Sequence, residues 1–476
     1  MGAACILGSV EEDVLREIRP SPEERDRLRE VAGRAVNLVQ HALRQLGVEA
    51  RVTIEGSYAK DTWLRGDVDL DVFLLLPEET CLETIESGLV EKLAALLSST
   101  GVKVELRYAQ HPYLRFMVDG VWVEAVPGCS VSDPSRPLTA VDRTPFHRIY
   151  VIEHTTPEMR DEIRLLKSFM KGVGVYGAEL AVRGFSGYLT ELLVIHYQCF
   201  RRVLEAALTW RPPVIIDVEG RHGRRELLKK FRGAAMIVPD PVDPGRNAAA
   251  AVSRRSIALF ITAARLYLRE PSKRFFRVPG EARVSPPLLP GSVVAAYGPR
   301  ASNTVIIAME PGRTLPPDNM WGIALRALRQ ARGLLERWGF RVLAASAHAG
   351  GEGRIALAIE LESRLLPRYE LHLGPHAWNG ENAERFLEKY RRDTEALGPW
   401  VEEDGRLAVA RPRRYRDAVE LLRGRLAEWL PGSARGYRVE IAPLPAAASE
   451  LRGEELEWLA REAARAPSWL KPGLSS

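Results

Sequence analysis

The chain has 476 residues, of which 46% are hydrophobic and 27% charged, and this composition excludes a mainly disordered protein. Its formal net charge of +5 permits a polyanionic partner without demanding one. The sequence contains neither an apolar run long enough to span a bilayer nor the basic leader of a signal peptide. We therefore expect a soluble cytoplasmic protein of about three domains that has no membrane partner.

The first 150 residues predict an α+β domain whose helices flank a mixed sheet. Ser21, Pro22 and Glu24 have the order of a capped helix start, and apolar residues then recur at helical spacing until Gly47. A tight turn is predicted at Asp119-Gly120. Strands are predicted over residues 51–55, 69–76, 102–108, 113–118 and 121–126, and a helix over residues 82–97.

The rest of the chain predicts a helical part followed by a second α+β part. Helical patterns cover residues 157–200 and 248–268, and Pro and Gly cluster at residues 279–291. Beyond this cluster we expect strands at residues 293–297, 304–309, 340–344 and 354–361 and a helix at residues 317–339. Trp321, Leu325, Leu328, Leu335 and Trp338 are predicted to mark one side of that helix. The order of elements suggests a ferredoxin-like unit, and the predicted domains are residues 1–150, 151–280 and 281–476.

The four cysteines are Cys5, Cys81, Cys129 and Cys199, and no two of them have the spacing of a metal site or a redox motif. The sequence thus predicts neither a zinc site nor a disulfide framework. A reducing compartment fits this expectation.

The segment Gly56–Leu75 (GSYAKDTWLRGDVDLDVFLL) carries the most specific chemistry in the sequence. Asp69 and Asp71 lie two residues apart on a predicted strand, so both carboxylates share one face. Adjacent anions repel each other, and a hard divalent cation such as Mg²⁺ relieves that repulsion while binding phosphate oxygens. Gly56 allows close backbone approach, and the Ser57 hydroxyl and the Lys60 charge suit phosphate binding. The bland alternative is a solvated acidic strand end.

Glu124 is the candidate third carboxylate, which a two-metal site needs to orient the attacking oxygen. In the predicted strand around GVWVEAVPG it shares a face with Trp122 and Val126. It can reach the aspartate pair if this strand neighbours the strand that carries Asp69 and Asp71. Otherwise it is a polar residue on a strand.

The Gly-Ser turn, the spacer and the Asp-x-Asp strand resemble the signature of polymerase-beta-type nucleotidyltransferases. The chain as a whole resembles the archaeal (class I) CCA-adding enzymes, which are tRNA nucleotidyltransferases. The segments that carry the resemblance are VWVEAVPG, AVDRTPFH (residues 140–147), RLLKSFMKGVGVYGAELAVRGFSGYLTELL (residues 164–193) and DPVDPGRNAAAAVS (residues 240–253), together with the Gly56 segment. They cover the first half of the chain densely, and weaker likeness continues to GFRVLAASAH (residues 339–348).

The resemblance implies a polymerase-beta-like catalytic head, a helical central domain that completes the nucleotide site, and a tRNA-binding body and tail. It implies that Asp69, Asp71 and Glu124 hold Mg²⁺, and that Ser57 and Lys60 contact the triphosphate. It further implies that His147, Lys167 and Tyr176 complete the nucleotide site and that Arg246 helps to select C or A. Four of these residues also have a purely structural interpretation. Lys167 would be a solvated lysine on a helix and Tyr176 a packed loop tyrosine. His147 would be a residue at a helix start and Arg246 a solvated loop arginine.

Two positions depart from the usual pattern of the family. Relatives usually have Asp where this chain has Glu124, and Arg where it has Lys60. Because Glu is longer and Lys lacks a bidentate fork, we expect altered metal geometry and phosphate contact with activity retained.

The implied activity is template-independent addition of C, C and A to the 3′ end of tRNA from CTP and ATP. A poly(A) polymerase or another terminal nucleotidyltransferase is the alternative with the same chemistry, and a catalytically silent RNA-binding protein is the alternative from another class. The resemblance also implies a homodimer. Arginines of the last domain suggest contacts with the acceptor and T arm of tRNA, although a salt-bridged surface is the bland reading; they are Arg326, Arg329, Arg332, Arg337, Arg411, Arg413, Arg414 and Arg416.

Overall fold

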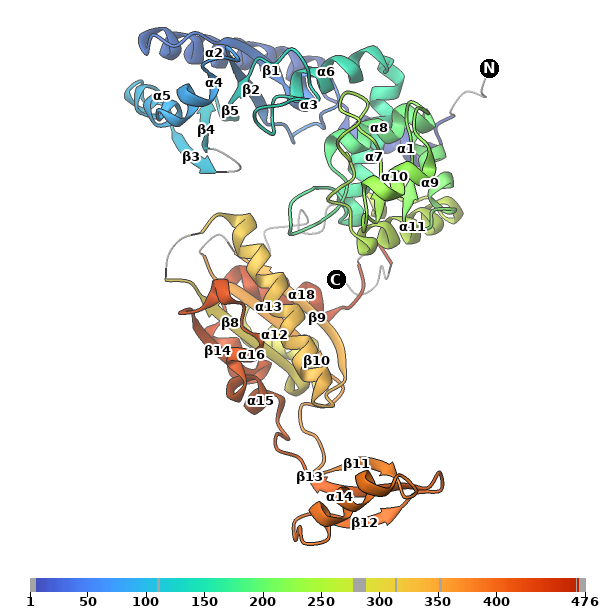
Figure 1. Ribbon diagram of the computed structural model, residues 1–476. Helices are drawn as coiled ribbons and strands as arrows, with labels where there is room; N and C mark the ends of the chain where they lie inside the picture. Colours follow the sequence, from blue (N-terminus) through green and yellow to red (C-terminus); the bar gives the residue numbers. More distant parts are fainter. Residues whose placement is uncertain are drawn as a thin grey trace. The chain divides into compact units, whose positions relative to one another are not determined.

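The computed structural model describes residues 6–108, 112–276, 288–312, 315–350, 353–467 and 469–470 (Figure 1). The chain forms two compact units, one of residues 1–283 with 467–476 and the other of residues 284–466. Among the helices in the described ranges, none is both long and apolar enough to cross a membrane.

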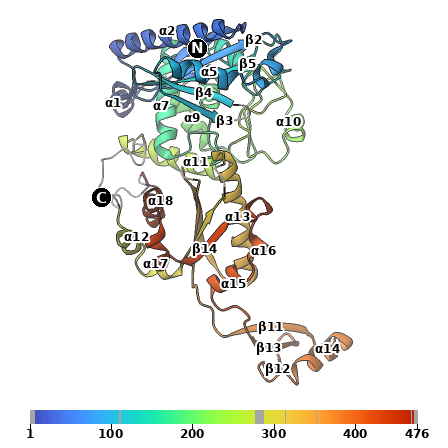
Figure 2. The same ribbon diagram turned by 90° about the vertical axis from the view of Figure 1, so that its left-hand side faces the viewer.

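The first unit begins with a five-stranded sheet in the order β1-β2-β5-β4-β3 (Figures 1 and 2). β2 runs parallel to β5, and the other neighbouring pairs are antiparallel. The predicted mixed sheet is therefore confirmed. α1 (Ser9–Ile18) precedes this part and buries Val14 and Leu15 in the helical core described below. The elements of the sheet part are α2 (Pro22–Gln45), β1 (Arg51–Glu55), α3 (Gly56–Ala59), β2 (Leu70–Leu76), α4 (Cys81–Glu86), α5 (Leu89–Ser99), β3 (Val104–Tyr108), β4 (Pro112–Val118) and β5 (Val121–Cys129).

One face of this sheet is covered by α2, α4 and α5. Leu70, Val72 and Leu74 of β2 are buried in the core that these helices form with the sheet. Because side chains alternate along a strand, Asp71 lies on the opposite face. The Ser21 hydroxyl caps α2 by accepting the N–H of Glu24 at 3.2 Å, as predicted.

The helix predicted over residues 82–97 is two helices. Gly88 separates α4 from α5 in the left-handed conformation, with φ at 81°, which interrupts helical hydrogen bonding. The apolar spacing continues across the break, so the sequence pattern did not reveal it.

A buried disulfide joins Cys81 and Cys129, whose Cα atoms are 5.5 Å apart. The expectation of no disulfide was therefore wrong. The two cysteines are 48 residues apart, and only the fold brings the start of α4 beside the end of β5. The inference of a reducing compartment loses its basis with this finding.

The second part of the first unit is helical and packs around buried aromatic side chains such as Phe169, Phe200, Phe260 and Tyr267. The helical pattern over residues 157–200 is interrupted after Gly174, which ends α7 at a φ of 80°. Ser186 then caps α8, and Ser253 caps α11. The elements are α6 (Thr144–Glu153), α7 (Pro157–Val173), α8 (Gly187–Tyr197), α9 (Phe200–Ala207), β6 (Val214–Ile215), α10 (Arg224–Lys230), β7 (Met236–Ile237) and α11 (Arg254–Arg269).

The second unit contains an antiparallel sheet in the order β14-β8-β10-β9. The chain order β8-α13-β9-β10-α15-β14 is the ferredoxin-like βαββαβ connection that the sequence predicted. The elements are α12 (Pro290–Tyr297), β8 (Thr304–Glu310), α13 (Pro317–Arg337), β9 (Val342–Ala349), β10 (Ile355–Leu361), α15 (Ala418–Gly424), α16 (Leu426–Trp429), β14 (Arg438–Pro443), α17 (Leu444–Ala447) and α18 (Gly453–Ala463). A smaller sheet, β11 (Tyr369–His376), β13 (Arg406–Pro412) and β12 (Leu397–Val401), carries α14 (Gly380–Tyr390) and is inserted after β10.

Two predictions for this unit were wrong in detail. Residues 293–297 belong to helix α12, where Val293 and Tyr297 lie one turn apart and are both buried. α13 buries its small residues Ala324 and Ala327 fully, whereas Trp321 is half-buried. Small side chains let the helix approach the sheet closely, and a pattern of large residues does not show that face.

Candidate active site

The strand register places two of the three predicted carboxylates side by side, and a shared arginine contact brings in the third. In the parallel ladder of β2 and β5, Asp71 is paired with Glu124. On the other side Asp71 is paired with Glu55 of β1. Asp69 lies just before β2, and Arg115 contacts both its carboxylate and that of Glu124. Glu124 thus meets the condition on which its candidacy depended.

The electrostatics of these carboxylates are those of crowded anions. Burial and the negative charges of Glu124 and Asp69 together raise the pKa of Asp71 to about 7, whereas the positive charge of Lys60 acts in the opposite direction. Burial and the charge of Asp69 also raise the pKa of Glu124. A divalent cation would remove the mutual repulsion that these shifts report.

Arg115 of β4 lies beside the carboxylates and pairs with two of them. Its Nη2 is 3.3 Å from Oδ1 of Asp69, and its Nε is 3.9 Å from Oε1 of Glu124. As the side chains lie, no group of three His, Cys, Asp or Glu residues in the described ranges is arranged to hold a metal ion. The oxygen donor set nevertheless suits Mg²⁺.

The Gly-Ser turn presses directly against Asp71. Gly56 has a φ of +69°, and a Cβ at this position would stand 1.7 Å from Oδ2 of Asp71. Ser57 follows in the short helix α3, where its carbonyl accepts the N–H of Thr62 at 2.9 Å. The Gly-Ser turn is therefore in close contact with the side chain of Asp71.

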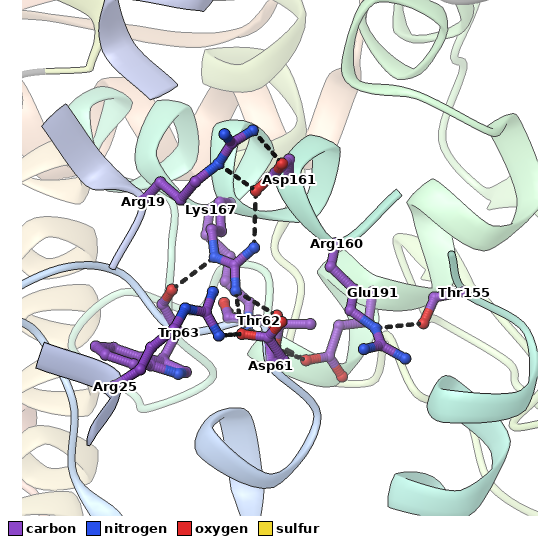
Figure 3. A network of polar contacts seen from close by, with 11 residues as sticks. Arg19, Arg25, Asp61, Thr62, Trp63, Thr155, Arg160, Asp161, Lys167 and Glu191 are labelled. Carbon is purple, nitrogen blue, oxygen red and sulfur yellow. Dashed lines mark hydrogen bonds and ion pairs between the residues drawn. The ribbon is translucent and has the colours of Figure 1, made fainter. Parts of the chain in front are cut away.

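Lys60 and Lys167 share one buried carboxylate, that of Glu191 in α8. Figure 3 shows Lys167, Thr62 and Glu191 of this group. Nζ of Lys60 is 2.5 Å from Oε2 of Glu191, and Nζ of Lys167 is 3.2 Å from Oε1. Burial lowers the pKa of Lys167 to about 8, although Glu191 opposes that shift. Burial alone would raise the pKa of Glu191, but the charges of Lys60 and Lys167 lower it to about 2.

His147 and Arg246 also share one buried carboxylate, that of Asp240. Nε2 of His147 and Nη1 of Arg246 are each 2.8 Å from Oδ2 of Asp240, and the Tyr188 hydroxyl donates to Oδ1 at 3.0 Å. The His147 ring stacks on Tyr188 with centroids 3.8 Å apart. Burial lowers the pKa of His147, and its hydrogen bond to Asp240 opposes this. Asp240 thereby fixes two of the predicted site residues in orientation.

Tyr176 stands apart from both carboxylate-centred groups. It forms an isolated bridge with Phe185, and Nζ of Lys171 lies 5.3 Å from the centre of its ring. Burial raises the pKa of its hydroxyl, and the charge of Glu191 adds to the rise.

Sequence reasoning missed Arg115, Glu191 and Asp240. Arg115 had a signal, because it alternates with apolar residues on a predicted strand next to that of Glu124. Glu191 is the one acidic residue in the apolar run LTELLVI. An acidic residue in such a run is buried, and a buried carboxylate needs a partner, so this position had a signal. Asp240 precedes a proline in a loop, and nothing in the sequence distinguishes it from a turn residue.

The fold and the acidic strand edge define a nucleotidyltransferase. Three family models match the chain in order: a nucleotidyltransferase domain over residues 37–121, the second domain of tRNA nucleotidyltransferase over residues 161–277, and the C-terminal domain of the CCA-adding enzyme over residues 302–438.

Curated relatives match nearly the whole chain. The CCA-adding enzyme of Sulfurisphaera tokodaii is 38% identical over 86% of this chain and 89% of its own length. The enzyme of Pyrobaculum islandicum is 38% identical over 87% of this chain and 93% of its own length. The enzyme of Saccharolobus shibatae is 35% identical over 97% of this chain and 100% of its own length. The chain belongs to the family of CCA-adding enzymes, as the sequence resemblance indicated. Among solved structures, the Cid1 poly(U) polymerase bound to Mg 3′-dATP has a TM-score of 0.45 at 13% identity and covers 56% of this chain and 97% of that one.

Proposed function

We propose that this chain adds C, C and A to the 3′ end of tRNA from CTP and ATP, and that Asp69, Asp71 and Glu124 form its catalytic centre. The observation that carries the assignment is the paired register of Asp71 and Glu124 in adjacent parallel strands, with Arg115 in contact with both Asp69 and Glu124. In the reaction, the 3′-hydroxyl oxygen of tRNA forms a bond to the α-phosphorus of the nucleotide. The bond from the α-phosphorus to the bridging oxygen breaks, and pyrophosphate leaves with it.

Asp69, Asp71 and Glu124 would hold Mg²⁺, which when bound lowers the pKa of the attacking hydroxyl and neutralises charge on the leaving pyrophosphate. Asp71 contributes a fixed, buried oxygen, because Gly56 and the neighbouring strands leave its side chain little freedom. Arg115 releases Asp69 and Glu124 when they turn toward the reacting atoms, and it keeps them paired otherwise.

The remaining site residues bind and orient the nucleotide. Ser57, Lys60 and Lys167 contact the triphosphate, where preorganised positive charge stabilises the transition state. His147, Tyr176 and Arg246 complete the nucleotide site, and Arg246 takes part in the choice between C and A. The support for this grouping is the position of Lys60, whose charge acts on both Asp71 and Glu191 and whose Nζ lies 5.9 Å from the ring of Tyr188.

The second unit binds the acceptor and T arm of tRNA in this proposal, and the protein acts as a homodimer in the cytoplasm. Arg414 and Arg416 are exposed and suit phosphate contacts, whereas Arg411 and Arg413 each pair with Glu370 at 2.9 Å. Light scattering of the purified protein would give twice the chain mass for a homodimer and the single mass for a monomer.

The deciding experiment supplies tRNA ending in C or CC with each nucleoside triphosphate in turn. We expect CMP and then a single AMP to be added, with Mg²⁺ required, and Asp71→Asn to lose activity by at least about a thousandfold. Continued AMP addition would instead identify a poly(A) polymerase. Unchanged incorporation by Asp71→Asn would refute the assignment of the catalytic centre.

A further inference from the structure

We propose that Glu191 is a positioning residue of the nucleotide site, which holds the ammonium groups of Lys60 and Lys167 where they meet the phosphates of the incoming nucleotide. This inference rests on the proposed function, because it assigns the two lysines to the triphosphate. It adds a residue that touches no substrate and acts through both lysines.

Both carboxylate oxygens of Glu191 are engaged by residues that come from separate parts of the first unit. Lys60 donates to Oε2 at 2.5 Å, and it belongs to the segment that follows the Gly-Ser turn. The Thr62 hydroxyl donates to Oε1 at 2.7 Å, and Lys167 of α7 donates to the same oxygen at 3.2 Å. Lys167 also donates to the Thr62 hydroxyl oxygen at 2.8 Å. Glu191 has no exposed surface, so these contacts fix it completely.

The charges of this group do not balance. Two ammonium groups face one carboxylate, and both lysines are more than nine-tenths buried. Lys167 uses its three N–H donors on Glu191 and on the carbonyl and hydroxyl oxygens of Thr62, whereas the hydrogen bond of Lys60 among the described residues goes to Glu191. Lys60 also acts on Glu55, which is itself paired with Arg148, and on Asp71, which belongs to the catalytic face. A phosphate oxygen would supply the missing negative charge, and it would do so beside the catalytic carboxylates.

The segment that carries Thr62 does not need Glu191 for attachment, because Arg164 of α7 already binds the residues on both sides of Thr62. Nε of Arg164 donates to the carbonyl of Trp63 at 3.0 Å, and Nη2 donates to the carbonyl of Asp61 at 2.6 Å. A buried ion pair is in general weak evidence for stability, since apolar residues of the same volume pack as well. The arrangement around Glu191 is therefore better explained by the two lysines that it positions.

Glu191 also keeps Lys167 charged. The charged groups that act on Lys167 are Glu191 from α8, Lys60 from the segment after α3 and Arg164 from its own helix. Glu191 is the one that raises the pKa of Lys167, whereas Lys60 and Arg164 lower it together with burial. Replacing Glu191 by neutral Gln therefore makes Lys167 lose its proton at lower pH.

The test compares Glu191→Gln, Thr62→Val and the control Glu162→Gln with the wild type, using tRNA that ends in CC and ATP between pH 6 and 9. For Glu191→Gln we expect the KM for ATP at pH 8 to rise at least tenfold with a smaller change in kcat. The alkaline fall of kcat/KM should begin about one pH unit lower, and the defect should shrink at pH 6. Thr62→Val should also raise the KM for ATP and move the alkaline fall of kcat/KM to lower pH, but by smaller amounts.

Glu162 is the matched control, because it is a buried carboxylate of the same unit whose Oε2 accepts the N–H of Phe200 at 2.9 Å. Glu162→Gln should keep the KM and the pH profile of the wild type. If Glu191→Gln and Thr62→Val lower the melting temperature but leave the KM and the alkaline fall unchanged, Glu191 is structural and the inference is overturned. If Glu191→Gln does not fold, Thr62→Val decides in the same way.

Failure of the proposed function can be distinguished from failure of this inference. The proposed function fails if the wild type binds ATP but transfers no nucleotide to tRNA. In that case calorimetric titration of ATP still tests Glu191. Weaker ATP binding by Glu191→Gln, increasing from pH 6 to pH 8, supports the inference, and equal binding overturns it.

Discussion

Gly56 shows how tightly a single position is constrained by the residue opposite it. An alanine Cβ would overlap the Asp71 carboxylate, and the φ of +69° is unfavourable for any L side chain. We expect Gly56→Ala to reduce nucleotide addition at least a hundredfold by displacing Asp71, with a loss of stability of about 1–2 kcal/mol. Steady-state rates and thermal melting would measure the two effects.

Gly33 provides the control for this substitution, because a Cβ there meets nothing within 4 Å in the middle of α2. Gly33→Ala should leave the rate unchanged and stabilise the protein by roughly 0.5–1 kcal/mol. An active Gly56→Ala with the rate of Gly33→Ala would show that the close approach to Asp71 has no catalytic consequence.

Individual residues of the site differ in how far the sequence could reveal them. The side of the sheet on which Asp69, Asp71 and Glu124 lie follows from alternation along strands, and their neighbourhood follows once β2 and β5 are paired. Glu191 and Asp240 could not be found in this way, since the lysine partners of Glu191 and the His147 partner of Asp240 lie at least 24 residues away, although Arg246 lies only 6 residues from Asp240. Local patterns carry no record of such pairs.

At the scale of elements, the sequence predicted whether a segment is a helix or a strand better than it predicted where the segment begins and ends. β1 has the bounds that were expected, and β5 continues three residues beyond its predicted end to Cys129. Gly88 divides a predicted helix, because a left-handed glycine can sit inside an unbroken apolar spacing. Residues 293–297 were misassigned because a short apolar run fits a buried helix as well as a strand.

The disulfide between α4 and β5 leads to a prediction about the stability of these elements. Closing a loop of 48 residues stabilises the folded state by about 4 kcal/mol in the chain-entropy estimate. We expect Cys81→Ala/Cys129→Ala to lower the melting temperature by roughly 10 °C. A thiol reductant should lower that of the wild type by more than that of the double variant. Peptide mapping without reduction would identify the linked pair, and equal melting of all samples would contradict the stabilisation.

At the scale of the molecule, both units contain buried carboxylates that pair with two basic side chains. In the first unit these are Glu191 and Asp240, whose partners are predicted site residues. In the second unit Glu360 pairs with Arg300 and Arg465. The second unit has a ferredoxin-like core with an inserted small sheet, and several of its arginines are exposed. The sequence predicted β8, α13, β9 and β10 of this core but not α15 or β14, and the pairing of Arg411 and Arg413 with Glu370 also required the structure.

The proposed division of labour predicts that exposed arginines of the second unit affect tRNA and leave the nucleotide unaffected. Arg414 and Arg416 are exposed at the end of the small sheet, and neither takes part in the pairs with Glu370. We expect Arg414→Ala/Arg416→Ala to raise the KM for tRNA about tenfold and leave the KM for ATP unchanged. Because each lost phosphate contact removes one released counterion, the slope of log binding constant against log salt should fall by about 2.

Arg29 is the control for a charge change in the first unit, since it is an exposed arginine that pairs with Asp26 at 2.7 Å on α2. Arg29→Ala should change neither KM by more than about twofold, because an exposed pair of this kind contributes little. The measurement is tRNA binding by filter retention between 50 and 200 mM salt, together with KM values for both substrates. A double variant that keeps the salt slope of the wild type would remove these two arginines from the tRNA contact. A rise in the KM for ATP would show instead that the second unit acts on the nucleotide site, and the division between the units would then be wrong.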